Sequence, residues 1–159
     1  MADFSKCPDV RLAVPEDIPV LLDLVRSYCE EEGKHPMDED KVLHHVYRYF
    51  EKMGVLIAVI GDVGSPVAYI LMEVCPLWYS QDFELLEKSH FVHPEYRKSD
   101  RAKQLMDFSK QASNGLNLEL KIGVLSNDKT AAKVRLYQRQ FENAGSFFMY
   151  RPSSAESNV

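Results

Sequence analysis

The strongest constraint on the fold is a pair of apolar segments separated by a short turn sequence. A continuous apolar run extends from Val55 to Ile60, and strand-forming residues resume from Val67 to Cys75. Between them lies the segment Gly61-Asp62-Val63-Gly64-Ser65-Pro66, whose composition favours a tight turn. The two runs therefore predict a β-hairpin. A further strand-like run, Phe83 to His93, extends the hairpin into a three-stranded antiparallel meander.

Helical patterns flank this meander. A short strand, Val10 to Val14, precedes Pro15-Glu16-Asp17, which is typical of a helix start, and apolar residues then recur at helical spacing up to Gly33. A second helix is expected from Asp38 to Met53, with an acidic first turn. After the meander, the patterns predict four more elements in alternation: a helix from about Asp100 to Ala112, a strand Leu118–Leu125, a helix from about Lys129 to Phe141 and a strand Ser146–Tyr150.

This order of elements predicts an α+β fold with helices packed on a mixed sheet. The 159 residues contain no internal repeat or linker, so we expect a single domain over residues 1–159. Its core would span about residues 10–150, followed by a loose Ser-rich tail.

Charge and cysteine content narrow the class of protein. With 24 acidic against 19 basic residues, the net charge of -5 would repel the phosphates of nucleic acids and anionic membranes. Three cysteines without CxxC spacing are typical of free thiols in a reducing compartment. The N-terminal residues give no signal for export, and no apolar run is long enough to span a bilayer. We therefore expect a cytoplasmic protein with no nucleic-acid or membrane partner.

The junction after the third strand is the main candidate site. Here the chain passes from strand to helix, so unpaired N–H groups and the positive end of the helix dipole would face the turn. Four cations fall within seven residues of this acidic chain: Arg97, Lys98, Arg101 and Lys103. The pattern indicates an anion site that suits a pyrophosphate. The alternative is a surface turn in which Ser99 or Asp100 caps the helix and the charges are solvated.

The same segment resembles the coenzyme A signature of the GNAT superfamily of N-acetyltransferases, Q/R-x-x-G-x-G/A. The matching register runs Arg97, Lys98, Ser99, Asp100, Arg101, Ala102. Its first and last positions agree with the signature, but Asp100 replaces the first glycine, and a carboxylate has the wrong charge for a neighbour of a pyrophosphate. The motif is closest to that of small phage and bacterial acetyltransferases, some of which carry serine in the turn.

The resemblance extends from about Val10 to Tyr150 and includes the order of elements. It implies a GNAT-like, mostly antiparallel sheet with helices on both faces, acetyl-CoA as acetyl donor, and no metal. It also implies that the strands Phe83–His93 and Leu118–Leu125 splay apart, so that the pantetheine arm pairs with backbone groups of Phe91 and Val92. The residues implied to bind the coenzyme in the turn are Arg97, Lys98, Ser99, Asp100, Arg101, Ala102 and Lys103.

Acetyl transfer to an amine requires an unprotonated amine, a donor for the oxyanion and an acid for the leaving thiolate. The resemblance places Tyr137 near the coenzyme sulfur, as that acid; the alternative is a tyrosine packed in the core. It also implies that Asn127 or Thr130 hydrogen-bonds the pantetheine. Asn127 has a second interpretation as a helix cap.

Two glutamates are candidates for the base that deprotonates the amine. Strand alternation groups Glu87 with Ser89 and Glu84 with Lys88, so only one of the two glutamates can face the cleft. Solvated strand carboxylates are the alternative for each of them.

The histidines and the acidic residues of the first helices do not indicate a metal or catalytic site. His90 and His93, three apart on one strand, point to opposite faces and do not make a metal site. The pair His44-His45 is expected to face solvent. Because the first helices line the acceptor side in this family, Glu30 and Asp38 would favour a cationic amine.

The sequence thus predicts an N-acetyltransferase that acts on an amine of a protein or small molecule, in a bacterial or phage-infected cytoplasm. Transfer of another acyl group and assembly into a homodimer both stay open. The alternative from another class is a catalytically degenerate GNAT-fold domain that binds a protein partner.

Overall fold

The computed structural model describes residues 1–124 and 130–152. The chain divides into two compact units, Met1–Gly123 and Val124–Val159. The first carries, in chain order, three short 3₁₀ helices (η), five strands and three α-helices: η1 (Phe4–Lys6), β1 (Val10–Leu12), η2 (Pro15–Asp17), α1 (Ile18–Glu32), α2 (Glu39–Phe50), β2 (Val55–Asp62), β3 (Ser65–Pro76), β4 (Phe83–Val92), η3 (Pro94–Tyr96), α3 (Arg101–Leu116) and β5 (Leu120–Lys121). The second carries α4 (Thr130–Gln138). The single domain expected from the sequence stays a prediction.

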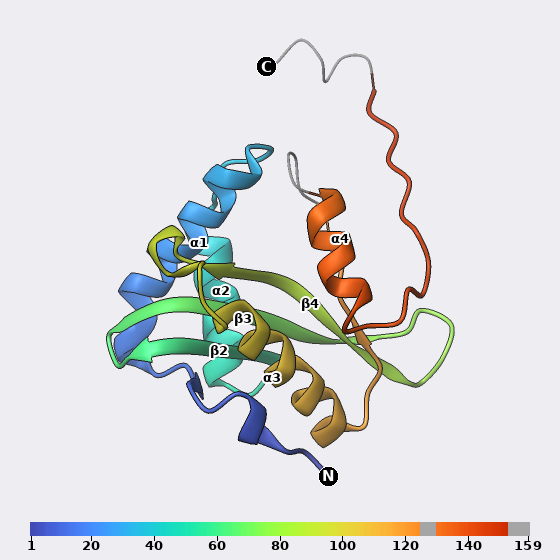
Figure 1. Cartoon of the computed structure of the whole chain (residues 1–159), viewed down its shortest axis with the longest axis horizontal. Helices are drawn as coiled ribbons and strands as arrows, with labels where there is room; N and C mark the ends of the chain where they lie inside the picture. Colours follow the sequence, from blue (N-terminus) through green and yellow to red (C-terminus); the bar gives the residue numbers. More distant parts are fainter. Residues whose placement is uncertain (125–129, 153–159) are drawn as a thin grey trace. The chain divides into compact units, whose positions relative to one another are not determined.

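The sheet of the first unit has the strand order β1-β2-β3-β4-β5. All neighbours are antiparallel except β4 and β5, which run parallel. Helices α1 and α2 lie behind the sheet in Figure 1, and α3 lies in front of it. The predicted mixed, mostly antiparallel sheet with helices on both faces is therefore confirmed.

The central hairpin forms where the two apolar runs predict it. β2 pairs with β3 from Val55 opposite Glu73 to Asp62 opposite Ser65. Gly61 has a φ of 121°, and a Cβ at this position would lie 2.7 Å from the carbonyl oxygen of Ser65. Only glycine fits there, because a side chain would collide with the backbone of the turn.

Both faces of this hairpin are buried, which explains its nearly continuous apolar sequence. One face packs against α1 and α2 in a core that joins Leu21, Val25 and Val46 to Ile57 and Tyr69. Because successive strand residues point to opposite sides, the intervening residues are buried on the face toward α3. They are Ala58, Ile60, Ala68, Ile70 and Met72.

A β-bulge in β4 changes which side chains share a face. Leu71 pairs with Ser89 and the next residue, Met72, pairs with Glu87, so Lys88 is an extra residue on β4. Directly opposed residues point to the same side of an antiparallel pair. Glu87 therefore lies on the α3 face with Met72, and the expected grouping of Glu87 with Ser89 is wrong.

The last predicted strands also differ from the structure. The strand expected over Leu118–Leu125 is limited, in the described residues, to β5, and the last helix is Thr130–Gln138. Residues 146–150 are not a strand, although their aromatic composition favours one. A strand needs a hydrogen-bonding partner, and the sheet that the described residues form has none for this segment. No helix among the described residues is both long and apolar enough to cross a membrane.

Candidate functional site

Within the described residues, the outer edge of β4 has no paired strand from Glu87 to Val92. β5 pairs only with Leu85 and Leu86, and within the described residues no strand follows on that side of β4. On the other side, the N–H of His93 donates to the carbonyl of Val67 at 2.9 Å. Ladder bonds alternate along an antiparallel pair, so the backbone groups of Phe91 point toward Tyr69 and those of Val92 point outward. Of the two residues expected to pair with pantetheine, Val92 is the one that faces the open edge.

Arg97 braces the turn that follows β4. Its Nε donates to the carbonyl of Val92 at 2.9 Å, and its guanidinium lies 5.0 Å from the ring centre of Phe91. The other end of the guanidinium forms an ion pair with Glu31 of α1 at 2.7 Å. Arg97 therefore joins the turn to β4 and to α1, and its charge is already paired.

The sequence left open whether Ser99 or Asp100 caps α3, and in the structure the cap is Ser99. The hydroxyl of Ser99 donates to the carbonyl of Tyr96 at 2.5 Å and accepts from the N–H of Arg101 at 3.4 Å. Asp100 makes no side-chain cap. Its carboxylate instead accepts from the amide of Gln104 at 3.0 Å, one turn into α3. The capping contact comes from Ser99, and the carboxylate of Asp100 lies along the side of the helix.

Hydrogen-bond donors remain open at the start of α3. The guanidinium of Arg101 lies 5.0 Å from the ring of Tyr96, and its Nε is buried with no hydrogen-bond partner among the described residues. The first N–H groups of a helix have no partner within the helix, and here Arg101, Ala102 and Lys103 occupy those positions. The ammonium of Lys103 forms an ion pair with Asp107 at 2.6 Å. The side chain of Lys98 is exposed to solvent. The turn can therefore donate to an anion from its backbone, from Arg101 and from Lys98.

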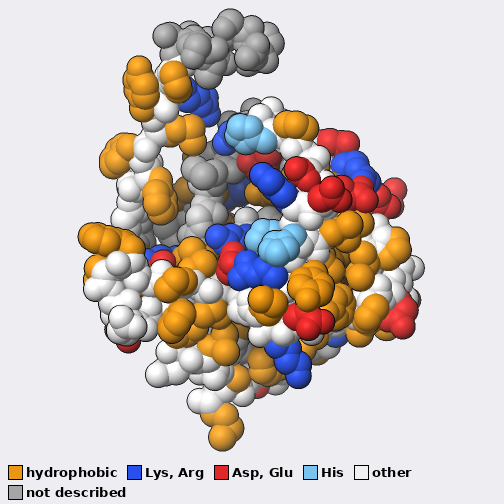
Figure 2. Space-filling view, turned by 180° about the vertical axis from the view of Figure 1, so that it is seen from behind, with side chains coloured by type: hydrophobic (Ala, Val, Ile, Leu, Met, Phe, Trp, Pro, Cys, Tyr) orange, Lys and Arg blue, Asp and Glu red, His pale blue; other side chains and the backbone are white. Residues whose placement is uncertain are grey.

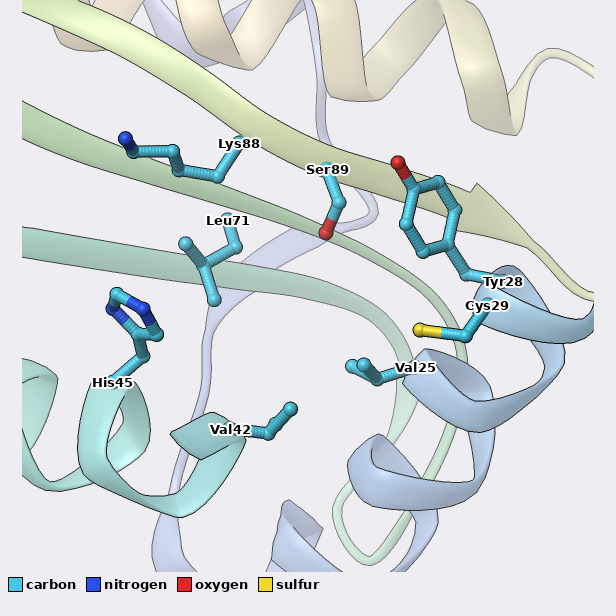
Figure 3. Close-up of a pocket in the computed structure, with 8 residues that line it drawn as sticks. All are labelled: Val25, Tyr28, Cys29, Val42, His45, Leu71, Lys88 and Ser89. Atoms are coloured by element: carbon cyan, nitrogen blue, oxygen red, sulfur yellow. The ribbon is translucent and has the colours of Figure 1, made fainter. Parts of the chain in front are cut away.

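A pocket of about 230 Å³ lies between β4 and the helices α1 and α2, on the face of the sheet opposite α3 (Figure 3). Leu71 and Ser89 form its floor, and Val25 and Val42 form apolar walls. Tyr28 extends toward β4 from α1, and His45 enters from α2. The space-filling view of this side, seen from behind, shows His side chains among mixed Lys, Arg, Asp and Glu side chains (Figure 2).

His45 does not face solvent as the sequence predicted, although His44 does. Its Nδ1 is buried and has no hydrogen-bond partner among the described residues, and burial lowers the pKa of the imidazole. The sequence contained a usable signal, because His45 follows Val42 by three positions and so shares its inward helix face.

Tyr28 is the second pocket residue that sequence reasoning missed. Burial, and then the charges of Glu32 and Glu87, raise the pKa of its phenol to about 12. The phenol therefore keeps its proton at neutral pH and can donate it in a hydrogen bond.

The two candidate bases lie on opposite faces of β4. Glu84 pairs with Cys75, on the face of α1 and α2, and forms an ion pair with Lys121 of β5. Glu87 lies on the α3 face with its side chain only 6% exposed, and its Oε1 is 3.0 Å from Nδ1 of His90. Neither glutamate lines the pocket.

The remaining expected site residues belong to the second unit. Tyr137 lies in α4, with its ring edge-on to Phe141 at 6.1 Å. Asn127 and the side chain of Thr130 lie outside the described residues. Their expected roles stay predictions.

The described residues contain no group of three His, Cys, Asp or Glu side chains that could hold a metal ion. No family model matches the sequence, and no curated protein matches it either.

Solved structures, in contrast, match almost the whole chain. A ribosomal-protein-alanine N-acetyltransferase of Brucella melitensis biovar Abortus 2308 is 17% identical, with 90% of this chain and 97% of the other covered and a TM-score of 0.70. A predicted acetyltransferase of Clostridium acetobutylicum, solved with acetyl-CoA, is 13% identical, with 89% and 94% covered and a TM-score of 0.69. The aminoglycoside 6'-N-acetyltransferase of Acinetobacter haemolyticus is 11% identical, with 91% and 97% covered and a TM-score of 0.67.

These structures share the architecture described above. At such low identities the likeness concerns the fold and not the reaction.

Proposed function

Starting from a chain with the fold of the GNAT acetyltransferases, we propose that this protein is an acetyl-CoA-dependent N-acetyltransferase. The observation that carries the proposal is the turn between β4 and α3. Here the N–H groups of Ala102 and Lys103 stand at the start of the helix, where the helix offers them no acceptor, and the Nε of Arg101 has no hydrogen-bond partner among the described residues. These donors are suited to a pyrophosphate. They lie directly after a strand whose outer edge is open.

The coenzyme would be held by two kinds of contact. Arg101, Lys98 and the backbone of Ala102 would bind the phosphates, and the outward N–H of Val92 would pair with the pantetheine amide. Arg97 would act as the brace of this turn, since it already binds the carbonyl of Val92 and Glu31. Bound in this way, acetyl-CoA supplies the thioester.

In the proposed reaction the nitrogen of an unprotonated amine attacks the thioester carbonyl. The new C–N bond forms, the C–S bond breaks, the amine loses a proton and the thiolate gains one. Glu87 or Glu84 is proposed to take the proton from the amine, directly or through water, and Tyr137 to protonate the thiolate. The partly buried face of β4 around Ser89 would exclude water from the reacting carbon.

Calorimetry with acetyl-CoA tests the first step of this proposal. We expect saturable binding with a dissociation constant below the millimolar range, and release of free coenzyme A thiol when an amine acceptor is added. Absence of binding at millimolar acetyl-CoA would refute the proposal.

A substitution tests the proposed acid. Tyr137→Phe removes the phenolic proton and keeps the ring, so kcat should fall about 100-fold or more while the affinity for acetyl-CoA stays within about twofold. The lost rate should be smaller at low pH, where solvent can protonate the thiolate. An unchanged kcat would refute the acid role.

Asp100 supports a second candidate, in which the domain binds a protein partner and no longer catalyses transfer. A carboxylate stands where the signature has glycine, and it would oppose the phosphates. Absence of acetyl-CoA binding at millimolar concentration, or binding without any turnover on a broad set of amines, would favour this candidate.

A further inference from the structure

The pocket between α1, α2 and β4 has an excess of positive charge at one end. The ammonium of Lys88 lies 3.5 Å from Glu73, and the same carboxylate accepts from Arg48 at 2.5 Å. Two cations therefore share one anion. His45 lines the pocket beside them, and its buried Nδ1 has no hydrogen-bond partner among the described residues.

The opposite end of the same pocket has nearby acidic groups. Tyr28 and Cys29 line it, and their pKa values are raised by burial first and then by neighbouring carboxylates. Glu32 follows Tyr28 by four positions in α1, so the two side chains lie on the same side of the helix. A cation or a polarised amine is favoured at this end, as the sequence-based expectation for Glu30 suggested.

Apolar side chains separate the two ends. Val25, Val42 and Leu71 form this middle section, and the whole pocket measures about 230 Å³. That volume is below the range of about 300–1,000 Å³ that drug-sized ligands occupy, so the occupant is small.

We propose that the pocket binds a small amine that also carries a carboxylate, with its amine toward Tyr28 and Ser89 and its carboxylate toward Lys88 and His45. This inference rests on the proposed acetyl transfer, for which the aminocarboxylate is the acceptor. The bulge in β4 makes the arrangement possible, because it brings Lys88 and Ser89 to the same face. A polyamine fits poorly, since it would place a second cation next to Lys88 and Arg48.

The test compares aminocarboxylates with their uncharged amides as acceptors. Glycine, leucine, γ-aminobutyrate and ε-aminocaproate vary the distance between the two groups and the apolar surface, and spermidine represents a polycation. With acetyl-CoA and the full chain, kcat/KM should be at least about tenfold higher for one aminocarboxylate than for its amide. Lys88→Glu should reduce that ratio about tenfold or more, because the carboxylate would then face a like charge. Lys6→Glu makes the same charge change in η1, outside the pocket, and should leave the ratio unaltered.

A binding readout supports the kinetics. Titration with the preferred aminocarboxylate should shift the ¹⁵N resonances of the His45 ring in the wild type, and this shift should be lost in Lys88→Glu. Preference for spermidine or for the amides, or a ratio that Lys88→Glu leaves unchanged, would overturn the inference. If acetyl-CoA itself does not bind, the proposed function fails. If it binds and amines are acetylated without regard to the carboxylate, only the present inference fails.

Discussion

The first unit contains two strand-to-helix junctions of similar local design and opposite character. In each, a strand leads into a short 3₁₀ helix that begins with proline, Pro15 in η2 and Pro94 in η3, and an α-helix follows. At the first junction the polar groups are paired with one another and buried. At the second most of the residues are exposed, and the Nε of Arg101 has no hydrogen-bond partner among the described residues.

The junction before α1 is built around Asp17, whose side chain is fully buried. Its carboxylate accepts from Arg11 at 2.7 and 2.8 Å and from the N–H groups of Val14 and Gly64 at 2.9 Å each. Burial alone would raise the pKa of this carboxyl, but the bonds from Arg11, Val14 and Gly64 outweigh it and hold the pKa at about 2. A charge fixed in this way contributes to stability and leaves no group for a ligand.

The junction before α3 also has an acidic residue and arginines next to a helix start, but they are arranged differently. Asp100 lies along the helix against Gln104 and makes no cap. Ser99 accepts only from the N–H of Arg101, so the N–H groups of Ala102 and Lys103 are left without a side-chain cap. A basic turn therefore indicates a binding site only when its acidic residues leave hydrogen-bond donors unpaired.

The largest expected effect on stability concerns the junction before α1, whose polar groups are paired and buried. Asp17→Asn removes the charge that pairs with Arg11, and should lower the free energy of unfolding by about 3–5 kcal/mol, as for other broken buried ion pairs. Urea denaturation measures it. The control is Asp23→Asn, since Asp23 pairs with Arg26 on the surface with its side chain 71% exposed, and a change within about 1 kcal/mol is expected there. Equal effects of the two substitutions would contradict the account.

The same carboxylate predicts a pH dependence. The folded-state pKa of Asp17, about 2, is below its ordinary value of 3.8, so its stabilisation is complete above about pH 4 and is lost as the pH falls toward 2. Wild-type protein should lose this part of its stability over that range. Asp17→Asn should not, which denaturation curves at several pH values can check.

The next largest effect is on acetyl-CoA binding and concerns the junction before α3. Arg101→Ala removes a charged donor whose Nε has no hydrogen-bond partner among the described residues. It should weaken acetyl-CoA binding about 10- to 100-fold, since hydrogen bonds to charged groups contribute about 1.5–3 kcal/mol. Lys103→Ala is the matched control, because its ammonium is already bound to Asp107, and it should change the dissociation constant less than about threefold. Calorimetry on both variants distinguishes a specific phosphate contact from a general loss of charge.

A smaller effect is expected from the residue that departs from the signature. Asp100→Asn keeps the contact with Gln104 and removes the charge, so acetyl-CoA affinity should rise about two- to fivefold. Asp100→Gly should act in the same direction. Weaker binding in both variants would show that the carboxylate helps to shape the turn.

The smallest effect concerns the cap of α3. The hydroxyl of Ser99 accepts from the N–H of Arg101 at a long 3.4 Å, so Ser99→Ala should cost only about 0.5 kcal/mol of stability, the low end for helix caps. Thermal unfolding measures this cost. A loss of stability as large as that of Asp17→Asn would mean that the polar groups of the junction before α3 stabilise the fold as much as those before α1.

Local sequence patterns predicted most of the first unit. The glycine and acidic boundary signals were correct: Gly33 ends α1 with a φ of 64°, and Asp38 caps α2 by accepting from the N–H of Lys41 at 3.1 Å. The apolar runs gave β2 and β3 because burial on both faces leaves few polar residues in a strand.

Features that depend on register or long-range pairing were not predicted. The bulge at Lys88 lies in the polar segment Glu87-Lys88-Ser89, which has no hydrophobic residue to fix the strand phase. The ion pair of Arg11 with Asp17 and the burial of His45 depend on how β1, α1 and α2 pack. The last predicted strand was wrong for a related reason, since aromatic composition at residues 146–150 indicates a propensity without specifying a partner.

A crystal structure of the protein grown with coenzyme A would show whether the turn before α3 binds the pyrophosphate of acetyl-CoA. We expect pyrophosphate density within hydrogen-bonding distance of the N–H groups of Ala102 and Lys103, with the guanidinium of Arg101 beside it. Density for coenzyme A elsewhere on the molecule, or none at millimolar coenzyme A, would contradict the account.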